Sequence, residues 1–172
     1  DHSAQLLQTT THQVPYKIKQ LSEKLGEAQS QLAQYHKQEN KEIAKALLER
    51  ATHIPTAGAG IKLIAEVMEN KSLEDLRVII DHLRNSDEAI ITLLAVATEG
   101  KANLILMMTP KLCRDDLNAI TLIKEIAPLI EGSGGGRKDL AQAGGKRPDK
   151  LNDALAQFST LINKGFKTTP IK

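Results

Sequence analysis

An apolar stripe near the N-terminus sets the strongest limit on how this chain folds. Its positions are separated alternately by four and three residues, which places them along one side of an α-helix. Pro15 is compatible with the first turn of a helix, and the apolar spacing resumes at Ile43. We therefore predict one helix from about Pro15 to about Ala51. The stripe consists of Val14, Ile18, Leu21, Leu25, Ala28, Leu32 and Tyr35.

This stripe needs a partner, because a single helix cannot bury one side against itself. The partner can be a second copy of the chain in a coiled coil, a neighbour in a longer parent chain, or the rest of this chain. A fourth alternative is a helical hairpin with a short stub around Ala4 to Leu7. The chain begins at Asp1 without a signal-like segment, as expected of a piece of a longer protein.

The pattern changes after a Pro- and Gly-containing loop from His53 to Gly60. We predict a helical arm over residues 1–52 and a globule over 53–172. The fold class is α/β (α+β), with a short sheet and a Gly-rich loop. The globule is expected to begin with a strand at 61–68 and a helix that has Ser72 as N-cap and Asp75 at its third position. A hairpin of strands 89–97 and 102–108 follows. After it we expect a helix from Arg114 that Pro128 disturbs, the Gly-rich loop, and a helix from Pro148.

The Gly-rich segment from Gly132 to Gly145 is the strongest candidate for a binding site. Glycine exposes backbone N–H groups, which can wrap around an anion. The segment lacks a dinucleotide-binding fingerprint, since Arg137 occupies the third glycine position, and it lacks a P-loop, since Arg147 follows Lys146. A flexible hinge is the alternative.

Charge is distributed unevenly along the chain. Residues 137–172 contain eight basic and three acidic residues, a net charge of +5, while the preceding part carries −3. A basic end is typical of a surface that contacts anions, and also of a solvated tail. Aromatic residues make up 2%, so nucleic-acid binding would depend on phosphate contacts rather than on stacked bases.

Catalytic and metal chemistry have little support. The single Cys113 excludes an internal disulfide and favours a reducing, intracellular compartment. No segment is apolar enough for a membrane span. Asp115 and Asp116 are expected at a helix start, where acidic residues favour the helix dipole. The histidines have no metal-ligand spacing: His2, His12, His36, His53 and His82.

Two glycine motifs carry a resemblance to a known family. Gly134-Gly135-Gly136-Arg137 and Ala141-Gln142-Ala143-Gly144-Gly145 resemble the C-terminal globule of alanyl-tRNA synthetases, which is similar to the DHH-associated domain of certain phosphoesterases. Leu73, Leu76, Arg77 and the segment 81–84 resemble the first helix of that globule, and the arm resembles the helical segment before it. In the phosphoesterases a histidine usually follows the three glycines, so Arg137 favours the synthetase branch.

The resemblance implies a non-catalytic, cytoplasmic domain that binds the outer corner of tRNA. It also implies coupling of the aminoacylation and editing domains, and support for dimerisation through the helical arm. The expected partners are tRNA, the rest of the synthetase and a second copy. No cofactor is expected here, since the ATP, Mg and Zn of the parent enzyme belong to other domains. By resemblance the contacts are Gly134, Gly135, Gly136, Arg137, Gln142, Gly144 and Gly145; charge adds Lys138, Lys146 and Arg147.

Two other functions compete with tRNA binding. One is the substrate-binding domain of a DHH-type phosphoesterase, against which Arg137 argues. The other is a purely structural dimerisation module whose globule binds nothing. Binding of tRNA to the isolated chain would distinguish the tRNA-binding function from the structural dimerisation module.

Overall fold

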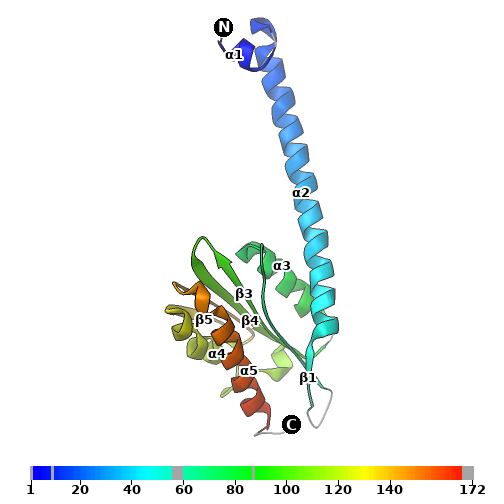
Figure 1. Cartoon of the computed structure of the whole chain (residues 1–172). Helices are drawn as coiled ribbons and strands as arrows, with labels where there is room; N and C mark the ends of the chain where they lie inside the picture. Colours follow the sequence, from blue (N-terminus) through cyan, green and yellow to red (C-terminus); the bar gives the residue numbers. More distant parts are fainter. Residues whose placement is uncertain (1, 9, 56–59, 87, 168–172) are drawn as a thin grey trace. The chain divides into compact units, whose positions relative to one another are not determined.

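The computed structural model describes residues 2–8, 10–55, 60–86 and 88–167 (Figure 1). Contacts divide the chain into two compact units, Asp1–Glu39 and Asn40–Lys172. The last turns of the long helix thus belong to the second unit. The domain boundary that the sequence places after residue 52 stays a prediction.

The first unit is helical. It contains α1 (His2–Leu6), the 3-10 turn η1 (Thr11–Gln13) and most of α2 (Val14–Arg50). The 37 residues of α2 confirm the single long helix predicted from the apolar stripe, and the helix ends one residue before Ala51.

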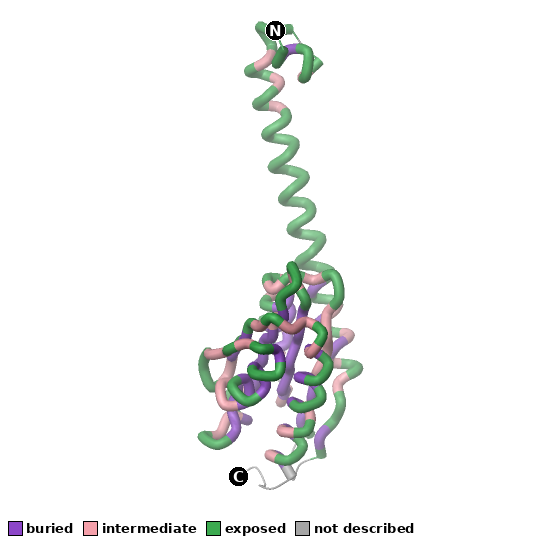
Figure 2. Tube along the Cα trace, turned by 60° about the vertical axis from the view of Figure 1, so that its left-hand side comes forward, coloured by how far each residue is buried: buried purple, intermediate pink, exposed green. Residues whose placement is uncertain are grey.

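The apolar stripe is exposed in the first unit. Leu21 is 44% exposed and Leu25 59%, and Figure 2 shows exposed residues along most of this part of α2. The five residues of α1 leave the stripe uncovered, so the predicted hairpin between the stub and the long helix is wrong. Within the described residues of this unit, most of the stripe is therefore not buried.

The second unit is built on one mixed sheet of six strands, in the order β1-β2-β3-β4-β6-β5. β2 and β3 are parallel, and α3 (Leu73–Arg84) forms the crossover between them. All other neighbours are antiparallel. The strands are β1 (Thr52–Ile54), β2 (Ile61–Val67), β3 (Ile90–Thr98), β4 (Lys101–Met108), β5 (Gly132–Gly136) and β6 (Leu140–Gly145).

Helices cover both faces of this sheet. The end of α2 and α3 pack on one face, where Leu47, Leu76 and Leu94 belong to one apolar cluster. On the other face α4 (Ala119–Ile126) and α5 (Leu151–Lys167) form the second cluster with Leu104 and Phe158. The central strands β3 and β4 read as nearly continuous apolar runs because both of their sides are buried.

Several predicted elements are confirmed by the structure. Ser72 caps α3: its hydroxyl accepts from the backbone N–H of Asp75 at 3.1 Å, and the Asp75 carboxylate accepts from the Ser72 N–H at 2.9 Å. The predicted strand at 61–68 and the hairpin of β3 and β4 are present. Pro128 ends α4, which continues as the 3-10 turn η3 (Ala127–Ile130).

The predicted start of the second globule helix at Arg114 is wrong. α4 begins at Ala119, where Asn118 accepts from the Thr121 N–H and Thr121 accepts from the Asn118 N–H. This reciprocal cap fixes the helix start, because it satisfies two backbone donors at once. Asp115 and Asp116 consequently lie in a bent segment before the helix.

Two predicted loops are strands instead. His53 and Ile54 belong to β1, which pairs with β2; residues 56–59 of the predicted loop lie outside the described part. The Gly-rich segment forms the hairpin of β5 and β6 at the sheet edge. Glycine disfavours strands by intrinsic propensity, but pairing of β6 with β4 and close packing on α4 override it here.

Candidate nucleic-acid interface

A groove of about 810 Å³ lies between α3 and the Gly-rich edge of the sheet. α3 packs on β3 and β4, and its exposed side forms one wall of the groove. The floor comes from β4, β6 and β5. The residues along the wall are Leu73, Arg77, Ile80 and Asp81, and the floor contains Asn103, Ile105, Ser133, Gly134, Gly135, Gly136, Arg137, Leu140, Gln142 and Gly144.

The glycines of β5 have two different functions. A Cβ at Gly134 would lie 2.8 Å from the Cβ of Ala143 and 3.2 Å from Ile123, so this glycine permits close packing on α4. A Cβ at Gly135 would have no atom within 4 Å, because this position faces the open groove. Gly135 therefore lets a ligand approach the backbone of the sheet edge closely.

Arg77 connects the groove wall to the groove floor. Its Nη2 donates to Oε1 of Gln142 at 3.3 Å, and its Nη1 donates to Glu74 at 2.7 Å. A guanidinium has only donors, so Gln142 must turn its amide oxygen toward Arg77. The amide N–H groups of Gln142 are then available to an acceptor in the groove.

Arg137 stands at the turn of the β5–β6 hairpin. Its backbone N–H donates to the carbonyl of Leu140 at 2.8 Å, which closes the turn. Its side chain is 67% exposed, and its Nε lies 3.4 Å from Asp139, which also accepts from Arg84. Since this ion pair is made through Nε, the two terminal nitrogens of Arg137 retain N–H donors for a ligand.

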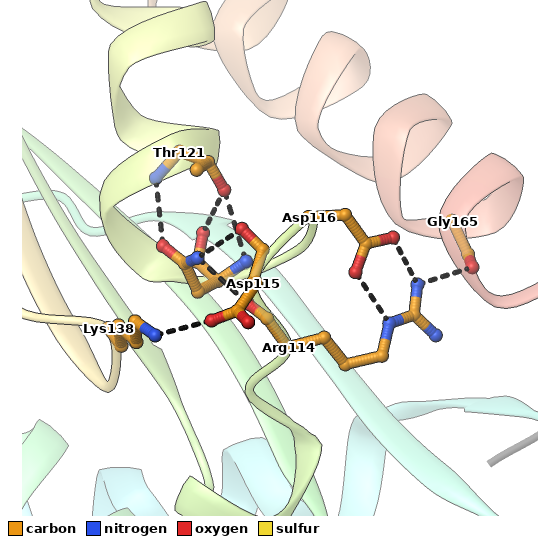
Figure 3. A network of polar contacts seen from close by, with 7 residues as sticks. Arg114, Asp115, Asp116, Thr121, Lys138 and Gly165 are labelled. Carbon is orange, nitrogen blue, oxygen red and sulfur yellow. Dashed lines mark hydrogen bonds and ion pairs between the residues drawn. The ribbon is translucent and has the colours of Figure 1, made fainter.

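Lys138 points away from the groove toward the start of α4 (Figure 3). Its Nζ lies 2.6 Å from Asp115, and this hydrogen bond raises the pKa of Lys138 and lowers that of Asp115. The Lys138 carbonyl accepts from the N–H of Ala119. In the same network Arg114 donates to Asp116 and to the carbonyl of Gly165 at 3.0 Å, which connects the segment before α4 to the end of α5.

Gly145, Lys146 and Arg147 lie beyond the far end of the groove. Gly145 and Lys146 line a second hollow of about 370 Å³, which shares Ser133 and Gly144 with the groove. Arg147 donates to Asp149 at 2.8 Å and to Glu131 at 3.0 Å, and these contacts raise its pKa.

The sequence analysis missed three residues of these two hollows as binding candidates. Arg77 and Asn103 line the groove, and Lys101 lines the smaller hollow. Only Arg77 had a signal, since it was part of the family resemblance. Asn103 and Lys101 become candidates through the register of β4 with β6, which sequence spacing does not reveal.

Metal-ligand groups and the free Cys113 are the two kinds of reactive chemistry that the described residues can be checked for. The described residues contain no group of three or more His, Cys, Asp or Glu side chains that could hold a metal ion. Burial and the nearby Asp139 raise the pKa of Cys113, whose thiol donates to the Lys138 carbonyl at 3.2 Å. A thiol with a raised pKa is a weak nucleophile. None of the described helices meets the length and hydropathy needed to cross a membrane.

Comparisons with known proteins agree with the resemblance seen in the glycine motifs. An alanine–tRNA ligase from Lactobacillus helveticus is 34% identical over 164 residues, which cover 95% of this chain and 18% of that protein. One from Lactobacillus gasseri is 36% identical over 149 residues, covering 87% of this chain and 16% of that protein. The chain thus spans less than a fifth of the length of these relatives.

A solved structure and a family model are also similar to this chain. The C-Ala domain from Aquifex aeolicus alanyl-tRNA synthetase matches with a TM-score of 0.52 and 26% identity, over 65% of this chain and 98% of that domain. The family model of the DHHA1 domain matches residues 60–164, which include the whole groove and both glycine motifs. The predicted resemblance is confirmed, and the chain belongs to the DHHA1 domain family.

Proposed function

We propose that this chain is the C-terminal module of an alanine–tRNA ligase and that its groove binds the outer corner of tRNA. The observation that supports the proposal is the combination of an open glycine floor with donors along the groove. Gly135 leaves the backbone accessible, while Arg77, Arg137 and the Gln142 amide offer N–H groups. The similarity to synthetase sequences and to the C-Ala domain supports the identity of the parent enzyme.

The chemistry of the groove suits the backbone and shape of RNA. A guanidinium can bind two phosphate oxygens at once, and the amide of Gln142 can donate to a further oxygen. None of the described residues that line the groove is aromatic, so none of them offers a ring on which a base would stack. Double-stranded parts of tRNA expose their backbone and 2′-hydroxyls more readily than their base edges, so this module needs little sequence reading.

The proposal also covers the partners of the module. Bound to the outer corner, the globule leaves the acceptor end of the tRNA free for the aminoacylation and editing domains of a cytoplasmic parent enzyme. The exposed stripe of α2 then pairs with the same stripe of a second copy. The chain supplies binding alone, and the ATP, Mg and Zn chemistry belongs to the other domains.

The direct test is the affinity of the isolated chain for tRNA, measured by gel shift across a salt series. The proposal expects binding that weakens as salt increases, because phosphate contacts release counterions. A chain that self-associates but does not bind tRNA at low salt would instead be a structural dimerisation module.

Replacing Arg137 with alanine should weaken tRNA binding by roughly 5- to 100-fold, the range for a lost charge-assisted contact. The slope of log affinity against log salt should fall by somewhat less than about one unit, since one phosphate contact is lost. Circular dichroism should be unchanged, because the side chain is largely exposed. Wild-type affinity and salt slope in this variant would remove Arg137 from the interface.

The isolated chain should show no aminoacylation, tRNA deacylation or phosphodiesterase activity. The described residues contain no group that could hold a metal ion, and burial raises the pKa of their cysteine, Cys113. The measurement is turnover of each substrate with added Mg²⁺, Mn²⁺ or Zn²⁺. Metal-dependent turnover that co-purifies with the chain and disappears in Gly135→Val would contradict this prediction and favour the phosphoesterase alternative.

A further inference from the structure

The cations predicted from the sequence differ in whether they are already paired. Arg137 lies beside Asp139, Lys138 beside Asp115, and Arg147 between Asp149 and Glu131. Lys146 is exposed and forms no ion pair with any residue that the structure describes. An unpaired cation binds an anion without first giving up a carboxylate partner, so Lys146 is the best placed of the four.

The sheet register brings a second unpaired cation to the same place. Ala102 lies opposite Gly145, the last residue of β6, so Lys101 on β4 and Lys146 directly after β6 both adjoin this pair. Both lysines line the hollow of about 370 Å³. Lys101 is also exposed, and no ion pair joins it to another described residue. These two lysines, which are 45 positions apart in the sequence, are termed the Lys101–Lys146 pair.

The surroundings leave the charge of this pair uncompensated. Two like charges that line one hollow repel each other. Among the described residues that line the hollow, Glu131 has the one carboxylate, and Arg147 already donates to it at 3.0 Å. The remaining walls are Gly132, Ser133, Gly144 and Gly145, which leave the hollow accessible. An anion between the lysines would convert their repulsion into attraction.

The pair is continuous with the groove. Ser133 and Gly144 line both hollows, and Lys101 shares its side of β4 with Asn103 of the groove floor, because side chains two positions apart lie on one face. A chain of phosphates that leaves the groove along β6 therefore reaches the pair next. Within the groove, Arg77 is opposed by Glu74, and Arg137 by Asp139.

We propose that the Lys101–Lys146 pair is a phosphate-binding site that holds the sugar-phosphate backbone of tRNA where it leaves the groove. This inference rests on the proposed function and assigns to it a residue, Lys101, that neither the glycine motif nor the basic C-terminal part contains. The site supplies electrostatic attraction, whereas the groove supplies shape and directed hydrogen bonds.

The test compares Lys101→Gln, Lys146→Gln and the double variant in tRNA binding across a salt series. Each single variant should lose roughly three- to tenfold in affinity, and the double variant should lower the salt slope by about 1.4 to 1.8, as for two phosphate contacts. Lys124→Gln is the matched control: Lys124 is exposed on α4, which packs on the other face of the sheet. The Lys124→Gln variant should keep the wild-type affinity, and its slope of log affinity against log salt should stay close to that of the wild type.

The outcomes separate this inference from the proposed function. If the wild-type chain does not bind tRNA, the proposed function fails. If it binds, and Gly135→Val weakens binding while the double lysine variant keeps wild-type affinity and slope, the groove binds tRNA and the lysine site is refuted. A second experiment measures how added inorganic phosphate changes the melting temperature of the wild type and of the double variant. Phosphate that stabilises the wild type but not the double variant, with equal tRNA affinity in both, would assign the pair to a free anion and overturn the inference.

Discussion

Gly135→Val should abolish most tRNA binding while leaving the fold intact. The new side chain would enter the open groove, where a Cβ meets no atom within 4 Å, and would keep RNA away from the backbone of β5. Valine is also favourable in strands, so the sheet edge should not weaken. Loss of the proposed phosphate contacts of Arg77 and Arg137 corresponds to roughly a hundredfold or more in affinity. Gel shift and thermal melting of the same preparation measure both effects.

The neighbouring glycine provides the control. At Gly134 even alanine would place its Cβ 2.8 Å from Ala143 and 2.9 Å from the Gln142 carbonyl oxygen. Gly134→Ala should therefore cost about 1–3 kcal/mol of unfolding free energy, the usual range for overpacking. A Gly135→Val variant with wild-type melting and wild-type tRNA affinity would show that RNA does not approach this strand.

Replacing Leu21 and Leu25 with aspartate should separate the proposed dimer. Both side chains are exposed in the first unit but are expected to be buried against the stripe of a second copy. Losing each buried leucine costs roughly 2–5 kcal/mol, and the new charges would repel across the interface. Sedimentation should show a monomer, and circular dichroism a loss of helicity, because an isolated helix is marginally stable.

Ser30→Asp with Gln34→Asp is the charge-matched control. Both residues are exposed on α2 away from the stripe, so this variant should remain associated and helical. A wild-type chain that is monomeric at all concentrations would show that the stripe binds another part of the parent enzyme. Equal behaviour of the stripe variant and the control would show that the stripe is solvated.

The sequence alone was sufficient for features that depend on local physics. The spacing from Val14 to Tyr35 determined a long helix, because 3.6 residues per turn place these side chains on one side. Ser72 and Asp75 determined the start of α3, since a capping box needs only residues three apart. The apolar runs 89–97 and 102–108 determined the β3–β4 hairpin, because a short turn joins two strands that are adjacent in the sequence.

Other features depended on contacts between distant segments. The Gly-rich segment was expected to be a loop and forms a hairpin, because β4 supplies hydrogen bonds to β6. The segment before α4 was expected to be helical but is bent, and distant contacts anchor it, such as that of Arg114 with the Gly165 carbonyl, 51 positions away.

The same division applies to the candidate site. The glycine motif identified a segment that lines the groove, because residues without side chains are visible in a sequence. The tertiary structure decided which members point into one groove, how Arg77 orients Gln142, and that Lys101 and Lys146 line one hollow. It also decided which cations are already paired. Strand register and salt bridges join residues that are far apart in the chain. These contacts form only when the sheet has folded, so the spacing of residues in the sequence does not reveal them.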